Sequence, residues 1–338
     1  MEDELDLSCG RARNRPLRVA GFLGAGAVCA LALTAIRALA GGGTAAPGPV
    51  ALWTTDRDAH AVYTLDADLF VTRTIPCGWP LQASACRDGG AWILRSGNGN
   101  PNFGGRLDRR SAAGELITEV TLAACTDLEV DERDEALVIE SKTSSHPDRA
   151  LRVRIEGSLF PLLELNGLTC VAPSHASVAL GTAAGKVLRV DAQGSGAILA
   201  QAQLGGRIGD IARGPYGGTL WVLDVSGARR LYLLEADLSV RWSVPVGLRA
   251  LHFAPVPNEE RVWLADTVEP RVRRFGPSGW LELEIAGLPL VGMDRAAAWL
   301  HGGVLCAAPG AIVHLDADGH LQSGQGGFDF LTDVAPAR

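Results

Sequence analysis

A repeat of about 42 residues constrains this chain of 338 residues more than any other feature of its sequence. Seven short apolar segments align so that one column holds Trp, Leu or Ala in every unit. The column consists of Trp53, Trp92, Leu137, Ala179, Trp221, Trp263 and Leu305. Successive members are 39 to 45 residues apart, which leaves room for four short strands in each unit. These are the dimensions of a propeller blade, so the sequence predicts an all-β fold, a seven-bladed β-propeller.

Short segments between the column residues alternate apolar and polar side chains with a period of two. Examples are KVLRVD (186–191), RLYLLE (230–235) and AIVHLD (311–316). This alternation is typical of half-buried antiparallel strands. Acidic residues end many of these segments and glycine often follows, so we interpret the acids as turn residues and not as catalytic groups. The large column residues are expected to pack between adjacent blades.

The last residues of the chain indicate how the ring closes. The segment FDFLTDVAPAR (328–338) is similar to the innermost strand that precedes the column residue in other units, such as LTCVAP (168–173). It is therefore expected to pair with the strand that follows Val50. Pairing of the N- and C-terminal strands within one blade would remove the open sheet edges.

The repeats resemble those of NHL and YVTN-type β-propellers over residues 50–338. The best match is VWLAD (262–266) followed by RVRRF (271–275), and LWVLD (220–224) with DIA (210–212) comes next. The resemblance implies a propeller but no particular activity, because such motifs encode blades. Streptogramin lyases and gluconolactonases have related propellers that need a metal at the channel mouth. No motif specific to either enzyme occurs in this sequence.

The N-terminal region predicts export or membrane anchoring. Residues 19–36 form an uncharged apolar stretch preceded by four arginines, which favour the cytoplasmic side. The sequence ALA that ends at Ala40 is a cleavage signal, so this region is either a signal peptide or an uncleaved hydrophobic helix. The predicted parts are a cytoplasmic n-region (1–18), a signal peptide or transmembrane anchor (19–40), a Gly/Pro linker (41–49) and the propeller (50–338). Both interpretations place the propeller in the periplasm or outside the cell, anchored or secreted.

Composition and cysteine content narrow the function further. A net charge of −7 leaves no basic surface for nucleic acid, and 47% hydrophobic residues exclude a disordered chain. In an exported protein, we expect a disulfide bond from Cys77 to Cys86 or from Cys125 to Cys170, with Cys306 unpaired.

Ionisable residues occupy the positions that begin the innermost strands, where side chains surround the central channel. Carboxylate and imidazole groups suit a divalent cation. The candidate metal ligands are Asp127, Asp210, His252 and Asp333. Aspartates at strand starts also bond backbone amides and brace neighbouring blades, so the sequence leaves both roles open.

Two long loops, in the second and third units, suggest a contact patch. They follow the column strand, and propeller geometry places them on the same face as the starts of the innermost strands. The candidate ligand-binding residues in these loops are Asn98, Asn100, Asn102, Phe103 and His146. Asn and Gly are also ordinary residues of solvated loops.

We therefore expect a protein- or ligand-binding or assembly module that docks an envelope or membrane protein on the face carrying these loops. The alternative is a metal-dependent lyase or lactonase with its site at the channel mouth. No cofactor is predicted apart from a divalent cation at that mouth, and no nucleic acid is expected as a partner.

Overall fold

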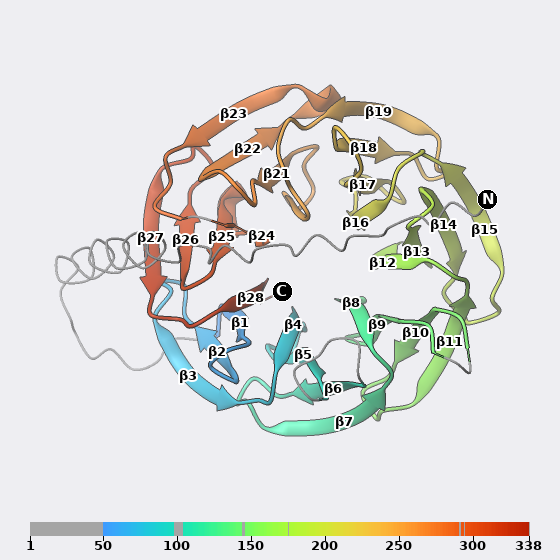
Figure 1. Ribbon diagram of the computed structural model, residues 1–338, viewed down its shortest axis with the longest axis horizontal. Helices are drawn as coiled ribbons and strands as arrows, with labels where there is room; N and C mark the ends of the chain where they lie inside the picture. The colour runs from blue at the N-terminus through green and yellow to red at the C-terminus, as the bar shows by residue number, and fades with distance from the viewer. Residues whose placement is uncertain are drawn as a thin grey trace, which may run out of the picture.

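A computed structural model describes residues 50–97, 104–143, 146–174, 176–290, 292–293 and 295–337. These residues form seven four-stranded antiparallel sheets, arranged as blades around a central axis (Figure 1). In each blade the four strands lie side by side, with the innermost strand at the axis and the outermost strand at the perimeter. The predicted all-β, seven-bladed propeller is confirmed.

Blades 1 to 4 follow the predicted units. From the centre outward, blade 1 contains β28 (Leu331–Pro336), β1 (Leu52–Asp56), β2 (Ala61–Leu65) and β3 (Val71–Pro76). Blade 2 contains β4 (Pro80–Ala85), β5 (Ala91–Ser96), β6 (Gly105–Arg110) and β7 (Leu116–Leu122). Blade 3 contains β8 (Cys125–Val130), β9 (Ala136–Glu140), β10 (Arg149–Val153) and β11 (Leu159–Glu164). Blade 4 contains β12 (Leu168–Ser174), β13 (Ser177–Thr182), β14 (Lys186–Asp191) and β15 (Ile198–Gln203).

Blades 5 to 7 have the same order. Blade 5 contains β16 (Ile208–Arg213), β17 (Leu220–Asp224), β18 (Arg230–Leu234) and β19 (Val240–Pro245). Blade 6 contains β20 (Phe253–Pro255), β21 (Val262–Ala265), β22 (Arg271–Phe275) and β23 (Leu281–Ala286), with a short 3-10 helix at Pro277–Gly279. Blade 7 contains β24 (Arg295–Ala298), β25 (Val304–Ala308), β26 (Ala311–Leu315) and β27 (Leu321–Gly326), with a second 3-10 helix at Leu300–Gly302.

Blade 1 closes the ring as the sequence predicts. Strand β28, from the C-terminal end, pairs antiparallel with β1, and Leu52 lies opposite Pro336. The hydroxyl of Thr54 adds a side-chain bond to the carbonyl oxygen of Asp333 at 2.6 Å. The first and last described strands therefore share one sheet, and no seam of unpaired backbone separates the two ends.

The repeating column is the layer on which the blades pack. All seven column residues lie on the second strand of their blade and are 0% exposed. Three of the tryptophans also donate their indole N–H to a carbonyl in the first turn of the next blade. The bonds are Trp53 to Gly89 (3.1 Å), Trp92 to Asp134 (2.8 Å) and Trp263 to Gly302 (3.1 Å). The column residues therefore belong to the hydrophobic core, as predicted. The hydrogen bonds from the three tryptophans also connect neighbouring blades.

The antiparallel order gives the ring two distinct faces. Turns from the first to the second strand and from the third to the fourth strand lie on one face, which we call the turn face. Connections from the second to the third strand, and from the fourth strand to the next blade, lie on the other, the loop face. Each innermost strand begins on the loop face and ends on the turn face.

The expected disulfide bonds are not formed, and all five described cysteines are buried. Cys77 packs in the apolar layer around Trp53, whereas Cys86 packs in the layer around Trp92. Likewise, Cys125 and Cys170 belong to different layers. The sequence expectation was wrong because residues that are close along the chain, or in adjacent blades, point into different inter-blade layers.

The predicted N-terminal helix and the boundaries at residues 18, 40 and 49 lie outside the described residues. Within the described part of the chain, none of the helices has the length and apolar character needed to cross a bilayer.

Candidate functional site

Polar side chains at the loop-face end of the channel link every blade to the next. They belong to the first residues of the innermost strands or lie just before them. We call this set the belt, and it consists of Gln82, Asp127, Thr169, Asp210, His252, Arg295 and Asp333. All four predicted metal ligands are members, so the structure brings them to one end of the channel, where about 200 Å³ of space remains.

Three aspartates of the belt accept a hydrogen bond from the backbone of the following blade. The carboxylate of Asp333 accepts from the amide of Ala83 at 3.0 Å, and that of Asp127 accepts from Val171 at 2.7 Å. Asp210 accepts from the amide of Phe253 at 3.1 Å. These bonds join blades 1 and 2, 3 and 4, and 5 and 6, which is the bracing role that the sequence left open.

The other four junctions use different chemistry. The amide of Gln82 donates to the carbonyl of Leu128 at 3.1 Å, and the hydroxyl of Thr169 donates to the carbonyl of Ile208 at 2.7 Å. The guanidinium of Arg295 lies 2.8 Å from Nδ1 of His252 and 3.5 Å from the carboxylate of Asp333. The belt therefore runs through all seven junctions.

Burial perturbs the acids of the belt. Desolvation raises the pKa of Asp127 to about 6, and the charge of Asp210 adds to it, while the amide of Val171 opposes the shift. Burial also raises the pKa of Asp333, against the opposing charge of Arg295. Burial raises the pKa of the Cys170 thiol as well. Burial thus disfavours the charged form of both carboxylates.

A metal at this end of the channel stays a prediction. Within the residues that the structure describes, no three His, Cys, Asp or Glu side chains are arranged to hold a metal ion. Nδ1 of His252 lies 3.3 Å from the carboxylate of Asp210, yet the same nitrogen faces Arg295. A cation would have to compete with that guanidinium and with the backbone amides.

The predicted loop patch is only partly described. Asn98, Asn100, Asn102 and Phe103 lie outside the described residues. Nδ1 of His146 lies 2.7 Å from the carbonyl oxygen of Pro147, and Nε2 lies 3.7 Å from the carboxylate of Glu140. The imidazole is half-buried beside these groups.

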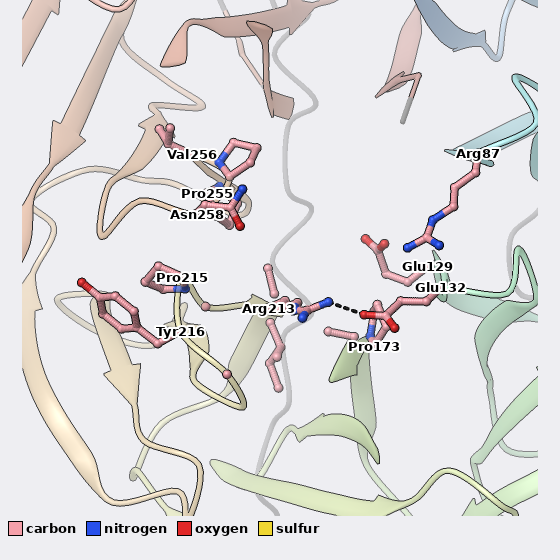
Figure 2. Close-up of a pocket in the computed structure, with 16 residues that line it drawn as sticks. Arg87, Glu129, Glu132, Pro173, Arg213, Pro215, Tyr216, Pro255, Val256 and Asn258 are labelled. Carbon is pink, nitrogen blue, oxygen red and sulfur yellow. Dashed lines mark hydrogen bonds and ion pairs between the residues drawn. The ribbon is translucent and has the colours of Figure 1, made fainter. Parts of the chain in front are cut away.

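A larger depression of about 540 Å³ opens at the opposite, turn-face end of the channel. The ends of the innermost strands and the first turns of blades 2 to 6 line it. Figure 2 shows Arg87, Glu129 and Glu132 along one side, and Arg213, from the end of β16, points towards Glu132 from the direction of Pro215. Arg213 and Glu132 form an ion pair, with side chains 47% and 55% exposed. Rigid apolar residues line the other side, with Pro215, Tyr216, Pro255 and Val256 among them.

The depression is continuous with the channel, because Glu129, Ile211, Ala212 and Pro255 line both. A second depression of about 580 Å³ adjoins it beyond Val256 and Pro257 and extends to blades 7 and 1. Sequence reasoning missed both. The available signal was the Ala-Pro pair that ends three innermost strands, at residues 172–173, 254–255 and 335–336.

Comparison with known proteins supports the fold and nothing finer. No family model matches the chain, and no curated protein matches it. A solved protein of unknown function from Desulfotomaculum acetoxidans is 14% identical, with a TM-score of 0.69 over 86% of this chain and 99% of that one. AztD from Citrobacter koseri is 16% identical, with a TM-score of 0.60 over 85% and 97%. Virginiamycin B lyase from Staphylococcus aureus is 13% identical, with a TM-score of 0.59 over 83% and 95%.

Proposed function

We propose that this protein is an exported, membrane-tethered β-propeller of the NHL type that acts as a binding and assembly module. Its partner is an envelope or membrane protein, which inserts a polypeptide segment carrying both positive and negative side chains into the turn-face depression. The observation that supports this proposal is the mixed set of charges at that depression, Arg87, Glu129, Glu132 and Arg213. The side chains of Arg213 and Glu132 are about half exposed.

The shape and chemistry of the depression favour an extended ligand. It crosses five blades, so a segment that lies in it would contact several of them at once. Proline and alanine walls present apolar surface without side-chain freedom to lose, which lowers the entropic cost of binding. The ion pair of Arg213 and Glu132 is solvent-exposed, and such pairs exchange partners at small cost.

The docking face proposed here differs from the one that the sequence suggested. The strand ends that flank the long loops of blades 2 and 3 lie on the loop face, where the ionisable groups of the belt are engaged in holding the blades together. The turn face offers the solvent-exposed ion pair of Arg213 and Glu132, together with the larger cavity.

Synthetic decapeptides of defined charge test this proposal. Fluorescence anisotropy would compare peptides with alternating Lys and Glu, with Lys only, with Glu only, and with Ser and Gly only. We expect the mixed-charge peptide to bind best, because it satisfies both arginines and both glutamates. The double variant Arg213→Ala/Glu132→Ala should weaken this binding at least about tenfold, as expected for the loss of two charged contacts.

A second exposed ion pair provides the matched control. Arg57 and Asp58 form a pair of similar exposure on the loop face, with a nitrogen–oxygen distance of 2.9 Å. The variant Arg57→Ala/Asp58→Ala should bind the mixed-charge peptide like the wild type. Equal losses in both double variants, or equal binding of all four peptides, would refute a turn-face site.

The alternative function is a metal-dependent lyase or lactonase at the loop-face end of the channel. The observation that favours this alternative is the grouping of Asp210, His252 and Arg295 beside the open space of the channel. Metal analysis of the purified protein tests it, with the variant His252→Ala and the triple variant of Asp127, Asp210 and Asp333 to Asn. Asparagine keeps an acceptor for the backbone amides, so folding is preserved. Stoichiometric metal in the wild type, lost from both variants, would support the enzyme.

A further inference from the structure

Large apolar side chains form a ring around the perimeter of the turn face. The first residue of every outermost strand is one of them, and neighbours in the adjoining turns and strands extend the ring. We call this set the apolar rim, and it consists of Phe70, Val71, Leu116, Ile117, Ile155, Leu159, Phe160, Ile198, Leu199, Val240, Trp280, Leu281 and Leu321. The most exposed are Trp280 at 64% and Leu199 at 58%. All seven blades contribute.

The rim is a property of one face and not of the perimeter as a whole. The same outermost strands end on the loop face, and their last residues are Pro76, Leu122, Glu164, Gln203, Pro245, Ala286 and Gly326. None of these is an exposed large hydrophobic residue. Among the described residues, the exposed large hydrophobics of the loop face are Trp79, Leu251 and Val268. Because both ends of each strand are equally peripheral, position on the perimeter alone does not explain the difference.

The described chain enters the ring on this same face. Leu52, which begins β1, lies opposite Pro336, which ends β28, so the chain joins the propeller at the turn face. The amide of Ala51 bonds the carbonyl of Leu65, which leads into the last turn of blade 1, at 2.9 Å. Residues 37–49 separate the apolar segment 19–36 from the described chain and span at most about 45 Å when extended.

The charged residues near the apolar rim indicate which kind of lipid surface it would contact. Acidic residues at the starts of the third-to-fourth-strand turns accompany the rim, including Asp66, Asp191, Glu235 and Asp316. Anionic headgroups would be repelled by them, whereas zwitterionic headgroups would not. Apolar and aromatic side chains in one plane are suited to insertion at the boundary between headgroups and acyl chains.

We propose that the turn face of the propeller lies against a zwitterionic lipid bilayer, with the apolar rim as its contact. This inference rests on the membrane tether in the proposed function and adds the orientation of the ring. The turn-face depression then opens towards the bilayer, so the segment that it binds comes from the membrane side. The loop face points away from the membrane.

Site-specific labelling of the full chain in phosphatidylcholine vesicles tests the orientation. Leu199→Cys and Gln203→Cys place an environment-sensitive NBD label near opposite ends of β15, on the turn face and the loop face. Cys9 and Cys29 are replaced by serine, and the five other cysteines are buried, so the label reacts at the introduced site. Vesicle flotation reports tethering, and quenching by headgroup-level spin-labelled lipid reports contact.

The expected result is flotation of both variants, with a blue shift and quenching at position 199 only. Adding phosphatidylglycerol should reduce the quenching at position 199. Flotation with no quenching at position 199, or with equal quenching at both positions, would overturn the orientation and leave the tether standing. Absence of flotation would refute the membrane tether, and the orientation with it, while peptide binding at the depression would be judged by its own assay.

Discussion

The two ends of the central channel use the same kinds of residue for different purposes. At the loop-face end, the carboxylates of Asp127, Asp210 and Asp333 accept backbone amides from the next blade. At the turn-face end, the carboxylate of Glu132 meets the guanidinium of Arg213 across the mouth, and both side chains are about half exposed. The first set is committed to holding the ring together, and the second is open to exchange.

This difference shows which property of a charged side chain indicates its role. The partner that the side chain binds is more informative than the residue type or its position in the channel. A buried carboxylate bound to a backbone amide loses a hydrogen bond if it takes another ligand. A surface ion pair gains or loses little when its partner changes. The aspartates at the loop-face end are candidate metal ligands in the sequence, and in the structure each of them accepts a backbone amide from the next blade.

Deleting residues 328–338 is the strongest test of the loop-face end. The deletion removes β28 and the belt residue Asp333, so it opens blade 1 and two belt junctions at once. We expect loss of the cooperative unfolding transition, because the exposed edge of β1 no longer has a partner. Differential scanning calorimetry checks this, and an undiminished melting temperature would show that closure does not stabilise the ring.

Substitution of Asp333 tests a single link of the belt. Asp333→Ala leaves the buried amide of Ala83 without its acceptor, and we expect a loss of about 1–3 kcal/mol in the free energy of unfolding. Asp333→Asn keeps an acceptor oxygen and should recover most of that loss. Urea denaturation measures both. Equal destabilisation by Ala and Asn would mean that the charge beside Arg295, and not the brace, is what matters.

The sequence predicted the fold much better than it predicted the site. The column from Trp53 to Leu305 recurs every 39 to 45 residues, because each blade must bury an apolar residue of its second strand against the next. Closure by the last strand followed from similarity to the other innermost strands. Both depend on patterns within the chain, which a repeat makes visible.

The belt and the turn-face depression depend on pairs that no local pattern connects. Asp333 meets Ala83 across 250 positions, and Arg213 meets Glu132 across 81. Spacing placed Asp127, Asp210, His252 and Asp333 at one end of the channel, but it did not show which backbone amides the three aspartates bind. It misled for Cys77 and Cys86, because these cysteines lie nine positions apart, where a disulfide bond was expected, but pack in different layers.

The pH dependence of stability sharpens the comparison. The pKa of Asp127 is raised from 3.8 to about 6 in the fold, so the folded state binds its proton more tightly than the unfolded state does. Its contribution to stability is therefore present in acid and is lost as the pH rises from about 4 through about 6. Relative to Asp127→Asn, the wild type should lose about 2–3 kcal/mol over this range and change little above it.

Urea denaturation of both proteins at several pH values measures this difference. Comparing the two proteins cancels the titration of other acids, such as Asp266. Burial raises the pKa of Asp266, but hydrogen bonds from the amides of Val268 and Glu269 and from the Arg271 side chain outweigh it, so the pKa is lowered overall. A constant difference across the range would show that the Asp127 carboxyl is as well solvated in the fold as it is in the unfolded chain.

The smallest expected effect belongs to the turn-face pair. Arg213→Ala and Glu132→Ala should each change the free energy of unfolding by no more than about 0.5 kcal/mol, and a double-mutant cycle should give a coupling below about 1 kcal/mol, because both side chains are solvent-exposed. Salt should reduce the coupling further. A coupling as large as the loss in Asp333→Ala would make this pair a structural brace like the belt. The turn-face mouth would then offer no freely exchanging charges to a ligand, and the contrast between the two ends would fail.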